Sequence, residues 1–119
     1  MAPDPRSFLP LRAPDLVLLL ALVDGERHGY ALARELSDRT DGVVALEPGN
    51  LYRVLRRLMA DGLVDESERR PAPDLDDERR RYYRLTPRGA RVAAAELERL
   101  RTLVSSPVAR ALVQRWGTT

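Results

Sequence analysis

The chain has 119 residues, a net charge of +2 and no cysteine, so it has the size of one domain and can form neither disulfides nor thiolate metal sites. Its hydrophobic content of 44% is enough for a core, and its scarce aromatic residues predict a core of Leu, Val and Ala, which suits helices. All 20 basic residues are Arg, and 11 of them fall in residues 48–91 against 8 acidic residues, whereas residues 1–47 hold 5 against 8. The positive charge is therefore concentrated in the second half of the chain.

The longest apolar run is LVLLLALV at residues 16–23. It is too short to cross a bilayer, which needs about 20 residues. The N-terminal stretch also lacks the shape of a signal peptide, since an acid and prolines precede any apolar segment. The sequence therefore predicts a soluble cytoplasmic protein without a membrane partner.

The first predicted helix begins at Pro14 and ends before Gly25. Proline suits the first position of a helix because its missing N–H group would have no partner there, and glycine is a common stop. The helix is apolar nearly all round, which predicts burial of most of its surface. Residues 1–13 are predicted to form an N-terminal arm, whose Phe8 and Leu9 either pack on a partner subunit or fray.

A second, amphipathic helix is predicted to open at His28 and to end near Thr40. Its apolar face contains Tyr30 and Ala33, followed by Leu36 or Ser37, at spacings of three and four residues. His28 is the only histidine, and its predicted role is in the turn that starts this helix. An Asp-Gly pair then breaks the pattern, and residues 43–46 are predicted to be a short extended piece.

A third helix is predicted from Pro48 to just before Gly62. Leu51, Leu55 and Leu58 recur at helical spacing and predict its core stripe. The opposite face carries polar side chains: Asn50, Arg53 and Arg57, with Arg56 at its flank.

Residues 63–86 predict a β-hairpin around a loop rich in proline and aspartate. In its second strand, alternate residues share a face. Tyr83 and Leu85 are therefore predicted to point into the domain. The outer face then carries Arg80, Tyr82 and Arg84, which would look toward solvent or toward a phosphate.

The last long helix is predicted over residues 87–104, with Thr86 as its cap. Its apolar residues follow the spacing that joins helices in pairs. A further segment with apolar residues on one side starts after Pro107. Together they predict a dimerisation surface made of Ala93, Leu97, Leu100, Val104, Leu112 and Trp116.

This order predicts a mainly α fold with a small β-hairpin. It is a winged helix-turn-helix at residues 14–86, followed by a C-terminal dimerisation helix region at residues 87–119. A helix-turn-helix places its second helix in the major groove of DNA, with the N-terminal residues nearest the bases. Here Gly49 lets the backbone approach DNA closely, and Asn50, Arg53, Arg56 and Arg57 would contact it. The strand would follow the phosphates with Arg80, Tyr82 and Arg84.

Three separated stretches resemble one family in order and spacing: HGYALARELSDRTDG at 28–42, EPGNLYRVLRRLMADGLV at 47–64 and RRRYYRLTPRGARV at 79–92. They resemble the PadR family of winged-helix transcriptional regulators, over about residues 14–92, and the short C-terminal region is similar to its small members. The resemblance implies a cytoplasmic homodimeric repressor that binds pseudo-palindromic operator DNA and is released by a small hydrophobic or aromatic effector. It also implies that Tyr52 lies near the DNA backbone.

Three features of the sequence differ from the family pattern and bear on DNA binding. Glu47 replaces the usual capping Ser or Asn before Pro48, and its charge favours the helix N-terminus but repels a nearby phosphate. Asn50 stands where the family more often has a small hydroxyl residue, and Asn can read adenine through two hydrogen bonds, so the operator preference would differ. The predicted hairpin tip is acidic at residues 74–78 and would oppose insertion into a minor groove. A protein-binding winged helix without DNA binding is therefore an alternative function.

The sequence predicts neither an enzyme nor a cofactor. It contains no recognisable pairing of a nucleophile with a base, no glycine-rich phosphate loop and no cluster of metal ligands. A lone histidine cannot hold a metal ion, and carboxylates in a loop are normally solvated.

Overall fold

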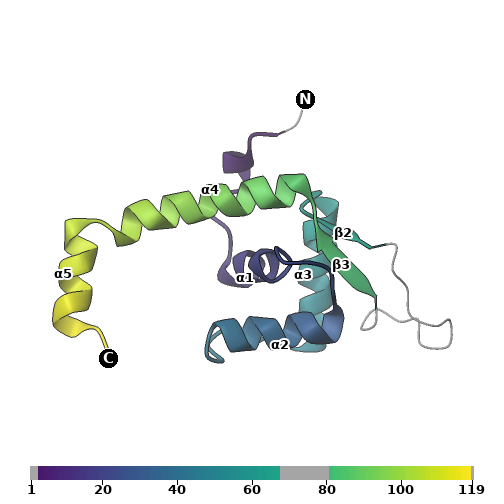
Figure 1. Ribbon diagram of the computed structural model, residues 1–119, viewed down its shortest axis with the longest axis horizontal. Helices are drawn as coiled ribbons and strands as arrows, with labels where there is room; N and C mark the ends of the chain where they lie inside the picture. The colour runs from purple at the N-terminus through teal and green to yellow at the C-terminus, as the bar shows by residue number, and fades with distance from the viewer. Residues whose placement is uncertain (1–2, 68–80, 119) are drawn as a thin grey trace.

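The computed structural model describes residues 3–67 and 81–118. In chain order its elements are η1 (Pro5–Phe8), α1 (Ala13–Ala21), β1 (Arg27–His28), α2 (Gly29–Arg39), α3 (Pro48–Ala60), β2 (Val64–Glu66), β3 (Tyr82–Leu85), α4 (Pro87–Val104) and α5 (Pro107–Trp116). Figure 1 shows α1, α2 and α3 grouped beneath α4, with the strands at one end and α5 at the other. This arrangement confirms the predicted mainly α winged helix-turn-helix. The predicted hairpin loop and Arg80 lie outside the described residues.

Proline is the first residue of α3, α4 and α5, whereas α1 begins at Ala13, one residue before the predicted Pro14. At α4, the hydroxyl of Thr86 accepts a hydrogen bond of 3.0 Å from the N–H of Gly89, which satisfies a backbone donor that the helix cannot. At α5, the Ser106 hydroxyl accepts one of 3.2 Å from the N–H of Ala109. The bounds of α4 match the predicted range of residues 87–104.

The core forms where the three helices below α4 meet. Leu51, Leu55 and Leu58 of α3 are all buried in it, which confirms the predicted stripe. From α2 the core receives Leu32 and Leu36, and Ala33 packs against it, so the predicted apolar face is confirmed at Ala33 and Leu36 and wrong at Tyr30, which is half exposed. The reason lies at the helix start, where a β-carbon on Gly29 would be 2.4 Å from the hydroxyl oxygen of Tyr52. That close approach puts position 29, and not 30, toward the core.

The sheet has three strands in the order β1-β3-β2, and both pairs are antiparallel. The sequence predicted only β2 and β3. β1 pairs through Arg27 with Tyr83, and Tyr83 is buried as predicted. Residues 43–46 are not a strand. Residues 43 and 44 form a bend, residues 45 and 46 have no regular structure, and the Thr40 hydroxyl accepts a hydrogen bond of 2.9 Å from the N–H of Val44.

The N-terminal arm packs on its own chain, so the prediction that it frays was wrong. Phe8 and Leu9 are partly buried against the core, and η1 lies beside α4 in Figure 1. The N–H of Leu11 donates a hydrogen bond of 2.7 Å to Oε2 of Glu96 on α4. The arm is therefore joined to α4 by the hydrogen bond between Leu11 and Glu96 as well as by apolar packing.

Glu96, the acceptor of that hydrogen bond, is 1% exposed. Its other carboxylate oxygen accepts a hydrogen bond from Nε of Arg99. This bond lowers the pKa of Glu96, burial opposes the shift, and the hydrogen bond from Leu11 adds to it. The carboxylate therefore stays ionised in the fold, because two donors hold its charge.

Candidate nucleic-acid interface

The N-terminal end of α3 is open. Gly49 and Asn50 are exposed, and a β-carbon added to Gly49 would meet nothing within 4 Å. The capping residue Glu47 makes no side-chain hydrogen bond to the helix. The first-turn amides therefore lack a side-chain cap, and helix N-termini of this kind attract anions such as phosphate.

Arg53 lies one turn further along α3 and is exposed. Among the residues that the structure describes, it takes part in no ion pair or hydrogen bond. Arg56 is also exposed, at the flank of the same helix. The guanidinium of Arg53 is thus available to an external acceptor, and its planar fork suits a phosphate or a guanine edge.

Arg57 leaves α3 on the same face as Arg53, as predicted, but its guanidinium is held by an acid of another helix. Its Nη2 atom donates to both carboxylate oxygens of Asp15 on α1, at 2.7 and 2.8 Å. Asp15 is a functional candidate that sequence reasoning missed. An acid in the first turn of a helix is ordinarily explained by the helix dipole alone.

Tyr52 also lies elsewhere than expected. It is 7% exposed and belongs to the core, with its ring against Gly29 of α2. Its contribution to the site is therefore the spacing between α2 and α3, the two helices of the helix-turn-helix.

On β3, Arg84 is exposed and Tyr82 is half-buried. The ring of Tyr82 meets the ring of His28 edge-on, with 5.6 Å between centroids. Arg84 comes within 3.9 Å of Asp65 on β2, a long and solvated pair that leaves its charge largely in place. The sheet thus places one exposed arginine beside the helix-turn-helix.

His28 does form the predicted turn at the start of α2. Its Nδ1 atom accepts a hydrogen bond of 3.2 Å from the N–H of Ala31, which caps the helix. This bond requires Nδ1 to be unprotonated. With Tyr82 against the same ring, His28 connects α2 to the sheet.

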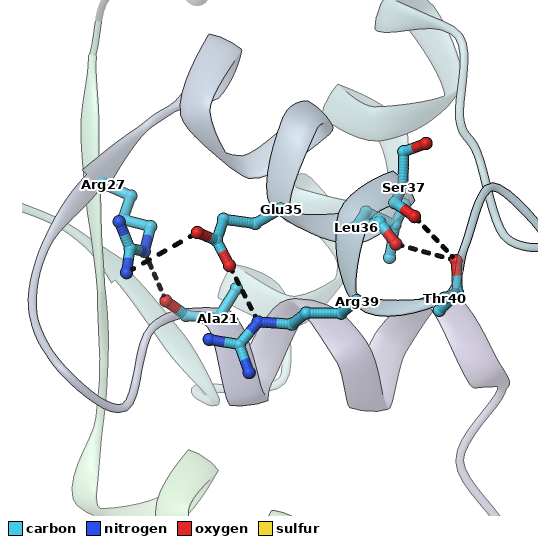
Figure 2. A network of polar contacts seen from close by, with 7 residues as sticks. All are labelled: Ala21, Arg27, Glu35, Leu36, Ser37, Arg39 and Thr40. Atoms are coloured by element: carbon cyan, nitrogen blue, oxygen red, sulfur yellow. Dashed lines mark hydrogen bonds and ion pairs between the residues drawn. The ribbon is translucent and has the colours of Figure 1, made fainter.

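A polar network fixes α2 to the elements before it (Figure 2). Nε of Arg27 donates to the carbonyl of Ala21 at 2.7 Å, and its Nη2 lies 4.0 Å from Glu35. Glu35 also pairs with Arg39 at 2.8 Å. At the other end of α2, the hydroxyl of Thr40 donates to the carbonyl of Leu36 at 2.9 Å. Arg27 and Arg39 therefore form hydrogen bonds and ion pairs within their own chain.

The predicted dimerisation residues divide into two groups. Ala93 is 4% exposed and packs in the core of its own chain together with Val92, so its predicted place on an outer surface was wrong. The others lie further along α4 and on α5, with Leu100 half-buried and the rest exposed: Leu97, Val104, Leu112 and Trp116. No residue of α5 is buried, and Trp116 is 70% exposed. The chain thus presents an apolar surface from Leu97 to Trp116.

A helix-turn-helix with a strand pair behind its second helix, and a long helix after it, defines the class of winged-helix proteins. The model of the Transcriptional regulator PadR-like family matches residues 18–95. The chain therefore belongs to this family of transcriptional regulators, as the sequence predicted. No helix in the described part of the chain is both long and apolar enough to span a bilayer.

Known proteins share the fold over different lengths. Transcriptional regulator Rv3488 of Mycobacterium tuberculosis is 42% identical over 74 residues, which are 62% of this chain and 63% of that protein. The chain spans no more than 66% of the length of the curated relatives it matches. The complex structure of RosR-S4 of H. salinarum is 31% identical, covers 94% of this chain and 91% of that one, and has a TM-score of 0.67.

A third structure is that of Bacillus subtilis PadR in complex with operator DNA. It is 20% identical, covers 74% of this chain and 48% of that one, and has a TM-score of 0.63. At this identity the likeness concerns the fold alone.

Proposed function

We propose that this chain is a repressor that binds operator DNA as a homodimer, with α3 in the major groove. The observation that carries the proposal is Arg53, an exposed arginine without a partner among the described residues, one turn from the open N-terminus of α3. Asn50 and Gly49 would lie nearest the bases, with Arg56 at the flank. Arg84 would contact the backbone from β3 together with Tyr82, and the same role is proposed for Arg80, which lies outside the described residues. Membership in the family and the DNA complex of Bacillus subtilis PadR support this reading.

The test is fluorescence anisotropy with two labelled duplexes, one from the region upstream of the gene and one scrambled, between about 50 and 200 mM salt. We expect tighter binding to the upstream duplex. Arg53→Gln should weaken it about tenfold or more and make the slope of log K against log salt shallower by about 0.9. Arg110→Gln on α5 removes the same charge from an exposed site and should bind as the wild type does.

Two results would contradict the proposal. Equal effects of the two substitutions would show that only net charge matters. Weak, equal binding of the wild type to both duplexes would instead favour a protein-binding winged helix.

The proposed homodimer would form through the apolar surface from Leu97 to Trp116. Its support is the exposure of these side chains, because a row of exposed apolar residues at helix-pairing spacing commonly marks an interface. Light scattering after size exclusion should give a mass of about 27 kDa, twice the 13.4 kDa of the chain. Leu112→Glu should give the monomer. Gln114→Glu introduces the same charge on α5 and should leave the dimer intact.

Release by a small hydrophobic or aromatic effector completes the proposal. It is supported by the family resemblance and by a shallow apolar groove of about 330 Å³ on α5, lined by Val108, Ala111, Leu112, Arg115 and Trp116. The guanidinium carbon of Arg115 lies 5.3 Å from the Trp116 ring centroid. Trp116 is the only tryptophan, so its fluorescence reports on this groove directly. An aromatic compound that releases DNA should quench it, and release without quenching would place the effector elsewhere.

A further inference from the structure

We infer that Asp15 is a positioning residue for DNA recognition, which holds Arg57 against α1 and thereby limits the arginines that α3 presents to Arg53 and Arg56. The inference rests on the proposed binding of DNA through α3. It goes beyond that proposal by assigning a role to a residue on a different helix.

The ion pair between Arg57 and Asp15 is short and its acid is almost buried. A single nitrogen of Arg57, Nη2, lies 2.7 Å from Oδ1 and 2.8 Å from Oδ2 of Asp15. The Asp15 side chain is 10% exposed, whereas that of Arg57 is 40% exposed. The carboxylate is therefore fixed in the fold, and the arginine reaches it from the surface.

Because of helix geometry, the ion pair between Asp15 and Arg57 decides how many arginines this face of α3 offers to DNA. Arg57 follows Arg53 by four residues, so the two side chains leave α3 on the same face, one turn apart. Without Asp15, both guanidinium groups would be available to a duplex lying along that face. With Asp15, the second arginine is turned back toward α1 and its charge is neutralised.

One other carboxylate lies near Arg57, that of Asp61, four residues further along the chain. A small cavity of about 180 Å³ beside the pair is lined by two further charged residues, Arg12 and Asp61. Neither forms an ion pair with Asp15 or Arg57. Asp61 caps the end of α3 through its backbone and is exposed. Asp15 is thus the residue that holds Arg57 against α1, and loss of its carboxylate would free the guanidinium from that helix.

A released Arg57 would add a contact to phosphate. Contacts to phosphate strengthen binding to every sequence, whereas contacts to bases discriminate between sequences. The ion pair should therefore favour specificity over affinity, by keeping a charge that carries no sequence information away from the backbone.

The experiment compares Asp15→Asn with Asp61→Asn, which changes the net charge equally at the end of the same helix. Anisotropy is measured with the upstream and the scrambled duplex over a range of salt. For Asp15→Asn we expect several-fold tighter binding to the scrambled duplex, a salt slope steeper by up to about 0.9, and a smaller preference for the upstream duplex. Asp61→Asn should keep the wild-type slope and preference. Equal effects of the two substitutions would overturn the inference.

A second variant covers the case in which Asp15→Asn unfolds, which thermal melting would reveal. Arg57→Gln should keep the wild-type salt slope, because Arg57 makes no phosphate contact, whereas Arg53→Gln should lower it. A slope lowered equally by both substitutions would overturn the inference while leaving DNA binding established. Failure of the wild-type protein to bind any duplex would overturn the proposed function itself, and this inference with it.

Discussion

Replacement of Glu96 by glutamine tests how the N-terminal arm is held to α4. The change keeps the size and shape of the side chain but removes its charge. The carboxylate accepts from two donors, the N–H of Leu11 and Nε of Arg99. Glutamine has one oxygen to accept with, so its NH₂ group must face one of these donors, and that hydrogen bond is lost.

The expected destabilisation follows from the kind of bond that is lost. A hydrogen bond to a charged group contributes about 1.5–3 kcal/mol. Leu11 donates at 2.7 Å to a carboxylate that is almost completely buried, so water cannot replace the missing acceptor. For a chain of this length, each kcal/mol lowers Tm by about 4 °C, so Tm should fall by about 6–12 °C.

Thermal melting followed by circular dichroism measures this change, at one protein concentration because association would also affect Tm. Glu98→Gln is the matched control. Glu98 is exposed and pairs with Arg101 at 3.2 Å in solvent, so its loss should change stability by less than about 0.5 kcal/mol. A fall in Tm that is the same for both variants would refute the reasoning, since burial would then have no influence.

The pH dependence of the same difference has a definite sign. The pKa of Glu96 is lowered from its ordinary value of 4.5, chiefly by the hydrogen bond from Arg99. The folded state therefore binds the proton less readily than the unfolded chain, and the stabilisation is fully present above about pH 4.5. It is lost as the pH falls further through the lower, folded value. The difference in Tm between the wild type and Glu96→Gln should shrink below that pH and stay constant above it.

Substitutions at Gly89, Leu55 and His28 test the packing of the domain by urea denaturation, with Gly49→Ala and His28→Asn as comparisons. Gly89→Ala would place a β-carbon 2.1 Å from the carbonyl oxygen of Leu63, so we expect a loss of about 3 kcal/mol, whereas Gly49→Ala meets open space and should be nearly neutral. Leu55→Ala removes a fully buried side chain and should cost about 2–5 kcal/mol; a smaller loss would mean that the core collapses around the gap. His28→Ala should cost about 1 kcal/mol through the lost cap of α2, and His28→Asn should restore most of it.

Features that depend on local periodicity could be predicted from the sequence. Leu51, Leu55 and Leu58 repeat at helical spacing, and one buried face accounts for all three. Tyr83 was placed inward because strand residues alternate. The start of α4 was given by Thr86 and the proline after it, a local capping pattern.

Features that depend on distant parts of the chain could not be predicted. Arg57 shares a helix face with Arg53, and only the fold brings Asp15, 42 residues earlier, within reach of it. β1 has two residues, too few for a strand pattern in the sequence, and it forms only by pairing with β3. Ala93 fits the apolar repeat of α4, but the repeat does not say which part of that long helix crosses the core and which part extends beyond it.

The strand order described above also has a consequence for synthesis on the ribosome. β3 lies between β1 and β2, so both outer strands find their partner only in residues 82–85. The nascent chain must therefore carry two unpaired edges until the central strand has emerged, and the pairing of Arg27 with Tyr83 then closes a segment of more than fifty residues. If the ribosome stalls before residue 82, the chain holds α1, α2 and α3 but lacks β3, which pairs with both β1 and β2. Such a chain would expose unpaired strand edges, which chaperones bind.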